Sequence, residues 1–144
     1  MGVPNVRIRH DYDPNGSTAA NPQFDNVFVN PAAYEAYLQA GTWPDKTVLV
    51  LERRSSESKL SINKNGRVQT SLAGVEVHVK DVARGGWAFY AFDRDSQQGV
   101  LLPENAGCNS CHQKNGAVDS TFVQFYPTLI DIAKRKGTFK NTPE

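Results

Sequence analysis

Two cysteines and a histidine near the C-terminal end of the sequence are the residues best suited to chemistry. They belong to the pentapeptide Cys108-Asn109-Ser110-Cys111-His112. Two thiols separated by two residues and followed by histidine are the attachment pattern of a c-type haem. Each thiol would bond to one haem vinyl group, and the imidazole of His112 would ligate the iron. The sequence therefore predicts one haem c, held covalently by Cys108 and Cys111, with His112 as the metal ligand.

The same spacing has other interpretations. A CxxC pair could form a structural disulfide, and within a βαβ unit it would indicate a thioredoxin-like redox site. No βαβ pattern surrounds this pair. A zinc site would need further cysteines or nearby histidines, and Cys108 and Cys111 are the only cysteines in the chain. We therefore favour haem attachment.

The composition is that of an ordinary globular domain. The 144 residues include 39% hydrophobic and 22% charged residues, and the formal net charge is +1. A charge so close to zero argues against nucleic acid or an acidic membrane surface as a partner, and no apolar run is long enough to span a bilayer. The first residues lack the apolar segment of a signal peptide. Because bacteria attach haem covalently outside the cytoplasm, we expect a periplasmic protein whose export signal is absent from this chain.

The N-terminal part is rich in turn-forming residues. Residues 1–26 contain many Pro, Asn, Asp and Gly, which predicts an irregular N-terminal arm with at most a short strand near residues 6–8. A single haem domain is expected over residues 27–144. It should begin with a helix, because Asn30-Pro31 is a good helix start and Gly41 is a good helix stop.

The middle of the chain has the patterns of strands. Residues 47–51 (TVLVL) read as a buried strand, and Asn65-Gly66 is a strong signal for a hairpin turn. Residues 75–80 (VEVHVK) alternate, so the valines are expected to face the core and the polar side chains to face solvent. Residues 87–92 (WAFYAF) predict another strand. The fold class is therefore α+β, a predominantly antiparallel β-sheet with a few helices and a C-terminal c-type haem motif.

The C-terminal segment has helical spacing with one interruption. Apolar residues recur at roughly helical intervals after the haem motif, and Pro127 must break or kink any helix that passes through it. Gly137 is the expected end of the last helix.

The second axial position of the iron has no obvious internal ligand. The only methionine is Met1, and the remaining histidines are His10 and His78, both expected at the surface. A lysine could ligate only after losing a proton. The simplest inference is a five-coordinate haem with one open face, suited to small-molecule chemistry, and a carrier with a second histidine ligand is a weaker alternative. Phe89 and Phe125 are candidates for haem contact, or for plain core.

Four segments resemble the cytochrome P460 family, and the resemblance reaches from about Val27 to Gly137. These segments are residues 74–81 (GVEVHVKD), 86–90 (GWAFY), 108–112 (CNSCH) and 122–127 (FVQFYP). The resemblance implies the fold shared by cytochrome P460 and cytochrome c′-β, with a c-type haem and a homodimeric assembly. It also implies oxidation of hydroxylamine to nitrous oxide or nitrite, with nitric oxide chemistry at the same iron and a soluble electron acceptor such as another cytochrome c.

The family places three further residues around the haem. A lysine of cytochrome P460 is bonded to the haem, and its position corresponds to Lys59 here; Lys64 is the competitor, with opposite parity along the strand. Proton transfer needs a carboxylate near the open face, for which Glu104 and Asp25 are the candidates. A family member carries arginine where Asp25 stands. The alternative within the same fold is a cytochrome c′-β-like protein, which binds nitric oxide or carbon monoxide and lacks the lysine bond.

Overall fold

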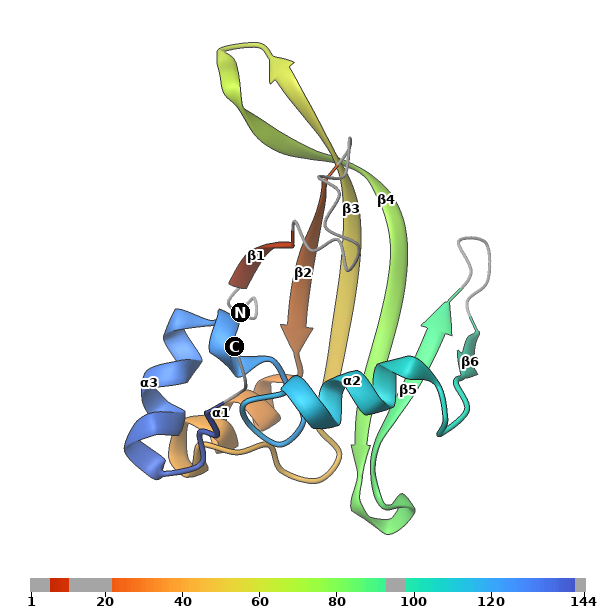
Figure 1. The fold of residues 1–144 in the computed structure, drawn as a ribbon, viewed down its shortest axis with the longest axis vertical. Coiled ribbons are helices and arrows are strands. Elements are labelled where there is room, and N and C mark those ends of the chain that lie inside the picture. The colour runs from red at the N-terminus through yellow and green to blue at the C-terminus, as the bar shows by residue number, and fades with distance from the viewer. Residues whose placement is uncertain (1–5, 11–21, 93–97, 142–144) are drawn as a thin grey trace.

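One antiparallel sheet dominates the computed structural model, which describes residues 6–10, 22–92 and 98–141. Its strands follow chain order, β1-β2-β3-β4-β5-β6 (Figure 1). The predicted α+β class with a mainly antiparallel sheet is thus confirmed. In these ranges the elements are β1 (Val6–His10), β2 (Gln23–Val29), α1 (Pro31–Ala40), β3 (Val48–Leu60), β4 (Asn63–Asp81), the 3-10 turn η1 (Val82–Arg84), β5 (Gly86–Phe92), β6 (Gly99–Leu101), α2 (Gly107–Asn115), the 3-10 turn η2 (Val123–Phe125) and α3 (Pro127–Lys136).

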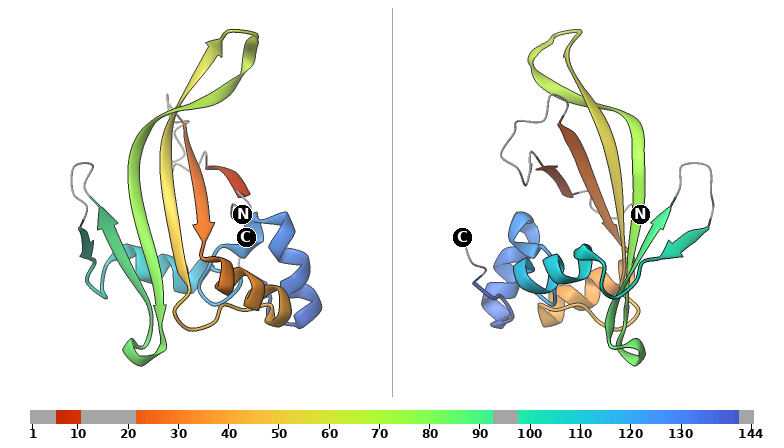
Figure 2. Two further views of the ribbon diagram at one scale, coloured as in Figure 1. Left: turned by 180° about the vertical axis from the view of Figure 1, so that it is seen from behind. Right: turned by 45° about the vertical axis from the view of Figure 1, so that its right-hand side comes forward.

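The three α-helices lie on the same side of the sheet (Figure 2). On that side β3 and β4 carry Leu51, Glu76 and His78, which line a cavity. Because side chains alternate along a strand, Val50 and Val77 lie on the opposite face. The prediction that the polar side chains of this part of β4 face solvent is therefore wrong. The alternation itself is present, but the helices cover the polar side of the strand.

β3 and β4 extend beyond the rest of the sheet as a two-stranded hairpin (Figure 1). Residues 56–69, which we call the hairpin extension, form strand pairs only with each other among the described residues. Leu60 pairs with Asn63, so Ser61-Ile62 reverses the chain, and Ser61 has the positive φ of 53° that a tight turn accepts. The turn predicted at Asn65-Gly66 is wrong, because the strand pairing closes before these residues and places them inside β4.

Part of the expected N-terminal arm belongs to the sheet. β2 begins at Gln23, so it crosses the boundary expected between residues 26 and 27. The short strand expected near residues 6–8 is present as β1, and it pairs with β2 in register from Val6 opposite Val27 to His10 opposite Gln23. Residues 11–21 of that arm lie outside the described part of the chain.

Both predicted ends of α1 are confirmed. Pro31 is its first residue, and Gly41 ends it with a φ of 72°. Asn30 precedes the helix as predicted, but its side chain does not cap the helix. Its Oδ1 instead accepts a hydrogen bond of 2.9 Å from the backbone N–H of Val48, which ties the helix entrance to the first residue of β3.

The buried hydrophobic cluster is built from α1, α3 and adjoining segments rather than from the strands of the sheet. The rings of Tyr37 and Trp43 pack with centroids 4.3 Å apart. The third helix, α3, begins at Pro127, which agrees with the break predicted at this residue. This cluster holds the segment that follows the haem motif in place, because Val118 and Val123 of that segment are buried in the cluster. The buried cluster consists of Tyr37, Trp43, Val118, Val123, Leu129 and Ala133.

Replacing Gly41 with alanine is expected to destabilise the fold more than the same change at Gly137. Both glycines end a helix with φ near +70°, so each alanine costs about 1–2 kcal/mol in backbone strain. A Cβ at Gly41 would also lie 2.6 Å from the Cβ of Lys136, whereas nothing lies within 4 Å at Gly137. Urea unfolding of both variants measures the difference. Equal losses of stability would contradict the packing described here.

Candidate haem site

The haem motif forms a short helix, α2, which sequence analysis did not predict. Cys108 and Cys111 are three residues apart on this helix, and His112 follows Cys108 by four, so the three side chains lie on neighbouring positions of one helical surface. Cys108 is half-buried and Cys111 is exposed, and the two are not joined by a disulfide. The helix therefore presents two available sulfurs at the surface and directs the histidine inward.

His112 is held in the state that a metal ligand needs. Its Nδ1 lies 2.9 Å from the backbone carbonyl oxygen of Ser120. Because a carbonyl oxygen can only accept a hydrogen bond, Nδ1 must carry the proton. The lone pair of Nε2 is then free to bind a metal. Burial lowers the pKa of His112, although the hydrogen bond to Ser120 and the charge of Glu76 oppose this shift. A neutral imidazole with an oriented Nδ1–H is the usual form of a metal-bound histidine.

Aromatic rings surround the His112 imidazole. The ring centroids of Phe122, Phe89 and His78 lie 4.4, 4.9 and 4.9 Å from it. Burial, with a smaller contribution from His112, lowers the pKa of His78 to about 3, so its ring is neutral at neutral pH. The expectation of a surface position for His78 is wrong for the reason given above, since it lies on the helix-covered face of β4.

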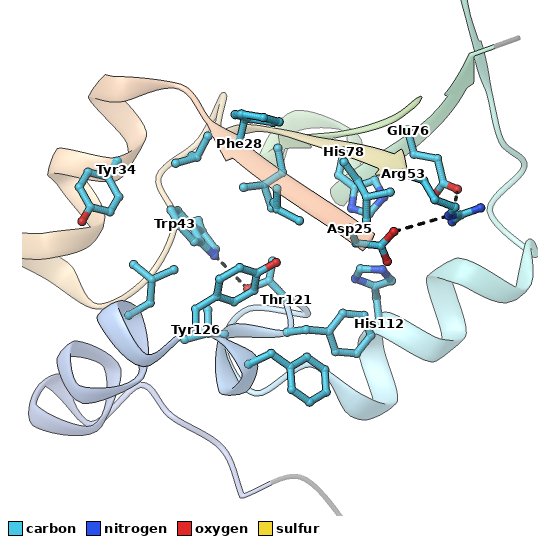
Figure 3. A pocket seen from close by; sticks show the side chains of 18 residues that line it. Asp25, Phe28, Tyr34, Trp43, Arg53, Glu76, His78, His112, Thr121 and Tyr126 are labelled. Atoms are coloured by element: carbon cyan, nitrogen blue, oxygen red, sulfur yellow. Dashed lines mark hydrogen bonds and ion pairs between the residues drawn. The ribbon is translucent and has the colours of Figure 1, made fainter. Parts of the chain in front are cut away.

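A cavity of about 250 Å³ opens beside His112 (Figure 3). This volume is somewhat below the ~300–1,000 Å³ of common small-molecule sites. The lining is largely apolar, and the following residues form it: Asp25, Val27, Phe28, Val29, Tyr34, Trp43, Leu49, Leu51, Arg53, Glu76, His78, His112, Thr121, Phe122, Val123, Phe125, Tyr126 and Leu129.

Three charged side chains form one wall of this cavity (Figure 3). Asp25 on β2 stands opposite Arg53 on β3 in the strand register. Their charged groups are 3.6 Å apart, from Asp25 Oδ1 to Arg53 Nε, and Arg53 also donates a 2.9 Å hydrogen bond to Glu76. Asp25 Oδ1 is buried and has no hydrogen-bond partner in the described structure. Burial raises the pKa of Tyr126, and the charge of Asp25 raises it further.

An orphaned carboxylate oxygen is costly in a protein interior. Burying a charged group without hydrogen bonds disfavours folding unless a partner compensates for it. Arg53 compensates only in part, because 3.6 Å is too long for a hydrogen bond. Asp25 Oδ1 is therefore available to a hydrogen-bond donor that enters the cavity.

The structure brings together some of the predicted site residues. His112, Asp25 and Phe125 line the cavity, and Phe89 packs directly on the His112 ring. Cys108 and Cys111 lie on the same helix as His112.

The structure does not bring Lys59 or Glu104 to the cavity. Lys59 is exposed on the hairpin extension, with a φ of 61°, and Glu104 is exposed before α2. Neither lines the cavity, whose lining includes no lysine. The parity argument that separated Lys59 from Lys64 also fails, because it assumed a turn at Asn65-Gly66. The Lys59 bond and the Glu104 role stay predictions without support from this geometry.

Sequence reasoning missed two charged residues of the cavity, Arg53 and Glu76. One signal was present for Glu76, since it shares a strand face with His78. A strand face that carries both a carboxylate and an imidazole is as compatible with a functional pocket as with solvent. Nothing in the sequence indicated that Arg53 lies opposite Asp25, because that contact depends on the register between β2 and β3.

The fold and this site define a class of protein, the c-type cytochromes built on an antiparallel sheet. Comparison with protein-family profiles matches cytochrome P460 over residues 7–123, most of the chain. The chain therefore belongs to the cytochrome P460 family, as the resemblance implied. Membership implies a covalently bound c-type haem and links the chain to haem-based oxidoreductase activity. A search among curated proteins found no match.

The residues present fit such a haem. Cys108 and Cys111 would supply the two thioether sulfurs, and Nε2 of His112 would ligate the iron. When bound, the haem iron would supply a redox centre. Asp25, with its orphaned oxygen, could accept a proton or a hydrogen bond from a small molecule in the cavity. Arg53 would keep negative charge in this wall compensated.

Proposed function

We propose that this protein oxidises hydroxylamine, and also binds nitric oxide, at a five-coordinate haem c next to the charged wall. Nitrous oxide or nitrite would be the product, and a soluble acceptor such as another cytochrome c would take the electrons. Membership of the cytochrome P460 family supports the haem and the redox class. The finer assignment to hydroxylamine depends on the residues of the cavity.

The observation that carries this proposal is the buried Oδ1 of Asp25, which has no hydrogen-bond partner among the described residues. Hydroxylamine carries N–H and O–H donors, and its oxidation releases protons as well as electrons. A carboxylate inside the cavity can accept one of these hydrogen bonds and then the proton. Arg53 and Glu76 extend the charged wall away from Asp25. Of these two, only the Glu76 carboxylate can accept a proton and pass it toward the surface, because Arg53 stays protonated and the Glu76 side chain is partly exposed.

Steady-state kinetics test the proposal. Purified holoprotein is mixed with hydroxylamine and an artificial electron acceptor, and the consumption of acceptor is compared with the formation of nitrous oxide and nitrite. Sustained turnover that depends on hydroxylamine is expected. Rapid binding of nitric oxide without turnover of hydroxylamine would instead identify a protein of the alternative class.

That alternative, a cytochrome c′-β-like binding protein for nitric oxide or carbon monoxide, has one observation in its favour. No lysine lines the cavity, and most of the lining is apolar. The charged wall favours the enzyme, because a protein that only binds a neutral diatomic gas has no need for Asp25 and Arg53 beside its ligand. We therefore keep hydroxylamine oxidation as the first proposal.

The bond between Lys59 and the haem is a separate and finer proposal. It is supported by the family resemblance alone, since Lys59 is exposed on the hairpin extension. Tryptic peptide mapping of the holoprotein tests it. A haem-bearing peptide that includes Lys59 would establish the bond, and recovery of Lys59 in a peptide without haem would exclude it.

Homodimer formation and a periplasmic location are also proposals. The sheet face without helices supports the dimer, because Val50, Val77, Tyr90 and Leu101 form a row across four strands, and Leu101 is 50% exposed. A second copy could cover this row, and light scattering on the holoprotein would measure the mass. Covalent haem attachment supports export. None of the described helices is long and apolar enough to cross a membrane.

A further inference from the structure

The hydrogen bond that orients His112 depends on a tight loop. The chain turns back after α2 so that the carbonyl of Ser120 reaches Nδ1 of His112. Asp119 and Ser120 have φ values of 48° and 57°, both in the left-handed region that non-glycine residues rarely adopt. A Cβ at Gly116 would lie 2.5 Å from the carbonyl carbon of Ser120, so the loop passes close to the end of the helix. Such a backbone persists only when its surroundings hold it.

Two neighbouring residues of the sheet hold this loop. Lys80 on β4 and Trp87 on β5 are cross-strand partners. The ammonium of Lys80 donates to Asp119 Oδ2 at 2.5 Å and to the carbonyl of Trp43 at 2.7 Å. The indole N–H of Trp87 donates to the carbonyl of Asp119 at 2.8 Å. Residues of the sheet therefore form hydrogen bonds with both the side chain and the backbone of Asp119, which precedes Ser120.

The ion pair is sheltered from solvent. The side chains of Lys80 and Asp119 are only 15% and 27% exposed, so their attraction is screened less than that of a surface pair. A second ion pair, between Lys46 and Asp81, differs from this one in the exposure of its lysine and in the element that it contacts. The Lys46 side chain is 65% exposed, and the partner of its ammonium is Asp81 rather than a residue of the loop.

We propose that Lys80 and Asp119 are positioning residues for the haem ligand His112. They hold the Ser120 carbonyl against Nδ1–H and thereby fix the orientation of the imidazole and its strength as an electron donor. A hydrogen bond at Nδ1 makes a ligating imidazole more basic, which favours ferric over ferrous iron. This inference relies on ligation of the haem by His112, but not on the oxidation of hydroxylamine.

The test is made on haem-loaded protein by spectroelectrochemical titration and resonance Raman spectroscopy. Lys80→Met is expected to raise the reduction potential and to lower the iron–histidine stretching frequency of the ferrous form, because the hydrogen bond at Nδ1 weakens. A tenfold loss of the preference for ferric iron corresponds to about 59 mV for a one-electron couple. Lys80→Arg, which keeps the charge, should restore both values toward those of the natural protein. Lys46→Met is the matched control and should leave both unchanged.

A smaller change covers the case in which Lys80→Met does not fold. Trp87→Phe keeps an aromatic ring but removes the N–H that donates to the Asp119 carbonyl, and a shift in the same direction is expected. Wild-type values in both Lys80→Met and Trp87→Phe would overturn the proposal. Absence of an iron–histidine band from the five-coordinate ferrous form of the natural protein would overturn it as well, and would contradict the ligand assignment. Absence of hydroxylamine turnover with these shifts present would refute only the proposed function.

Discussion

Replacing both motif cysteines with serine is expected to abolish haem attachment through thioether bonds. Cys108 and Cys111 are the only cysteines in the chain, and both lie on α2 without a disulfide between them. Without them no thioether can form, so the double variant should lose all haem that is bound through the motif. Haem staining after denaturing electrophoresis measures this loss, and any haem that remains would have to be held by another covalent bond such as the one proposed at Lys59.

Ser110→Ala is the matched control for the cysteine change. Ser110 lies between the cysteines, and its exposed hydroxyl donates to the carbonyl of Gly107 on the same helix. This variant keeps the attachment pattern and should stain like the natural protein. Covalent haem in the double cysteine variant would show that the group is attached elsewhere on the chain.

Replacing Asp25 with asparagine is expected to slow hydroxylamine oxidation by about 10²–10⁴-fold, the usual contribution of a general base. Asparagine keeps the shape of the side chain but cannot accept a proton near neutral pH. Binding of nitric oxide to the ferrous protein requires no proton acceptor, so it should be retained. Stopped-flow and steady-state kinetics on the same sample separate the two effects.

Asp131→Asn serves as the control for the loss of a carboxylate. Asp131 is an exposed residue of α3 and is not part of the cavity lining. Its replacement should leave turnover unchanged. Equal rates for Asp25→Asn and the natural protein would remove Asp25 from the mechanism, and Glu76→Gln would then test the remaining carboxylate of the wall.

Local signals in the sequence were sufficient for several elements. The start of α1 at Pro31, its end at Gly41 and the break at Pro127 each depend on the conformational limits of one residue, so they could be predicted without knowing the tertiary structure. The haem motif is equally local, because its chemistry is contained in five consecutive residues. The resemblance to cytochrome P460 was carried by such segments and is confirmed by the family match.

Long-range features could not be read in the same way. Alternation in β4 shows that Glu76 and His78 share a face, but it does not say whether helices or solvent cover that face. Which face of β4 is covered depends on where α2 and the segment after it pack, and these elements come more than 25 residues later in the chain. Likewise, Asp25 meets Arg53 only through the register of β2 with β3.

The hairpin illustrates a conflict between a local signal and strand pairing. Asn65-Gly66 is a favourable turn sequence, yet the pairing of Leu60 with Asn63 closes the hairpin earlier. This shift matters for function, because the choice of Lys59 over Lys64 assumed the later turn. A lysine bond to the haem therefore has to be established chemically.

The central claim is that His112 is the single internal ligand of a haem iron whose other face is open to the cavity beside Asp25. Electron paramagnetic resonance of the ferric holoprotein tests this most directly. Our account predicts a high-spin signal that changes when hydroxylamine is added. A low-spin signal from two internal ligands, unaltered by hydroxylamine, would contradict it.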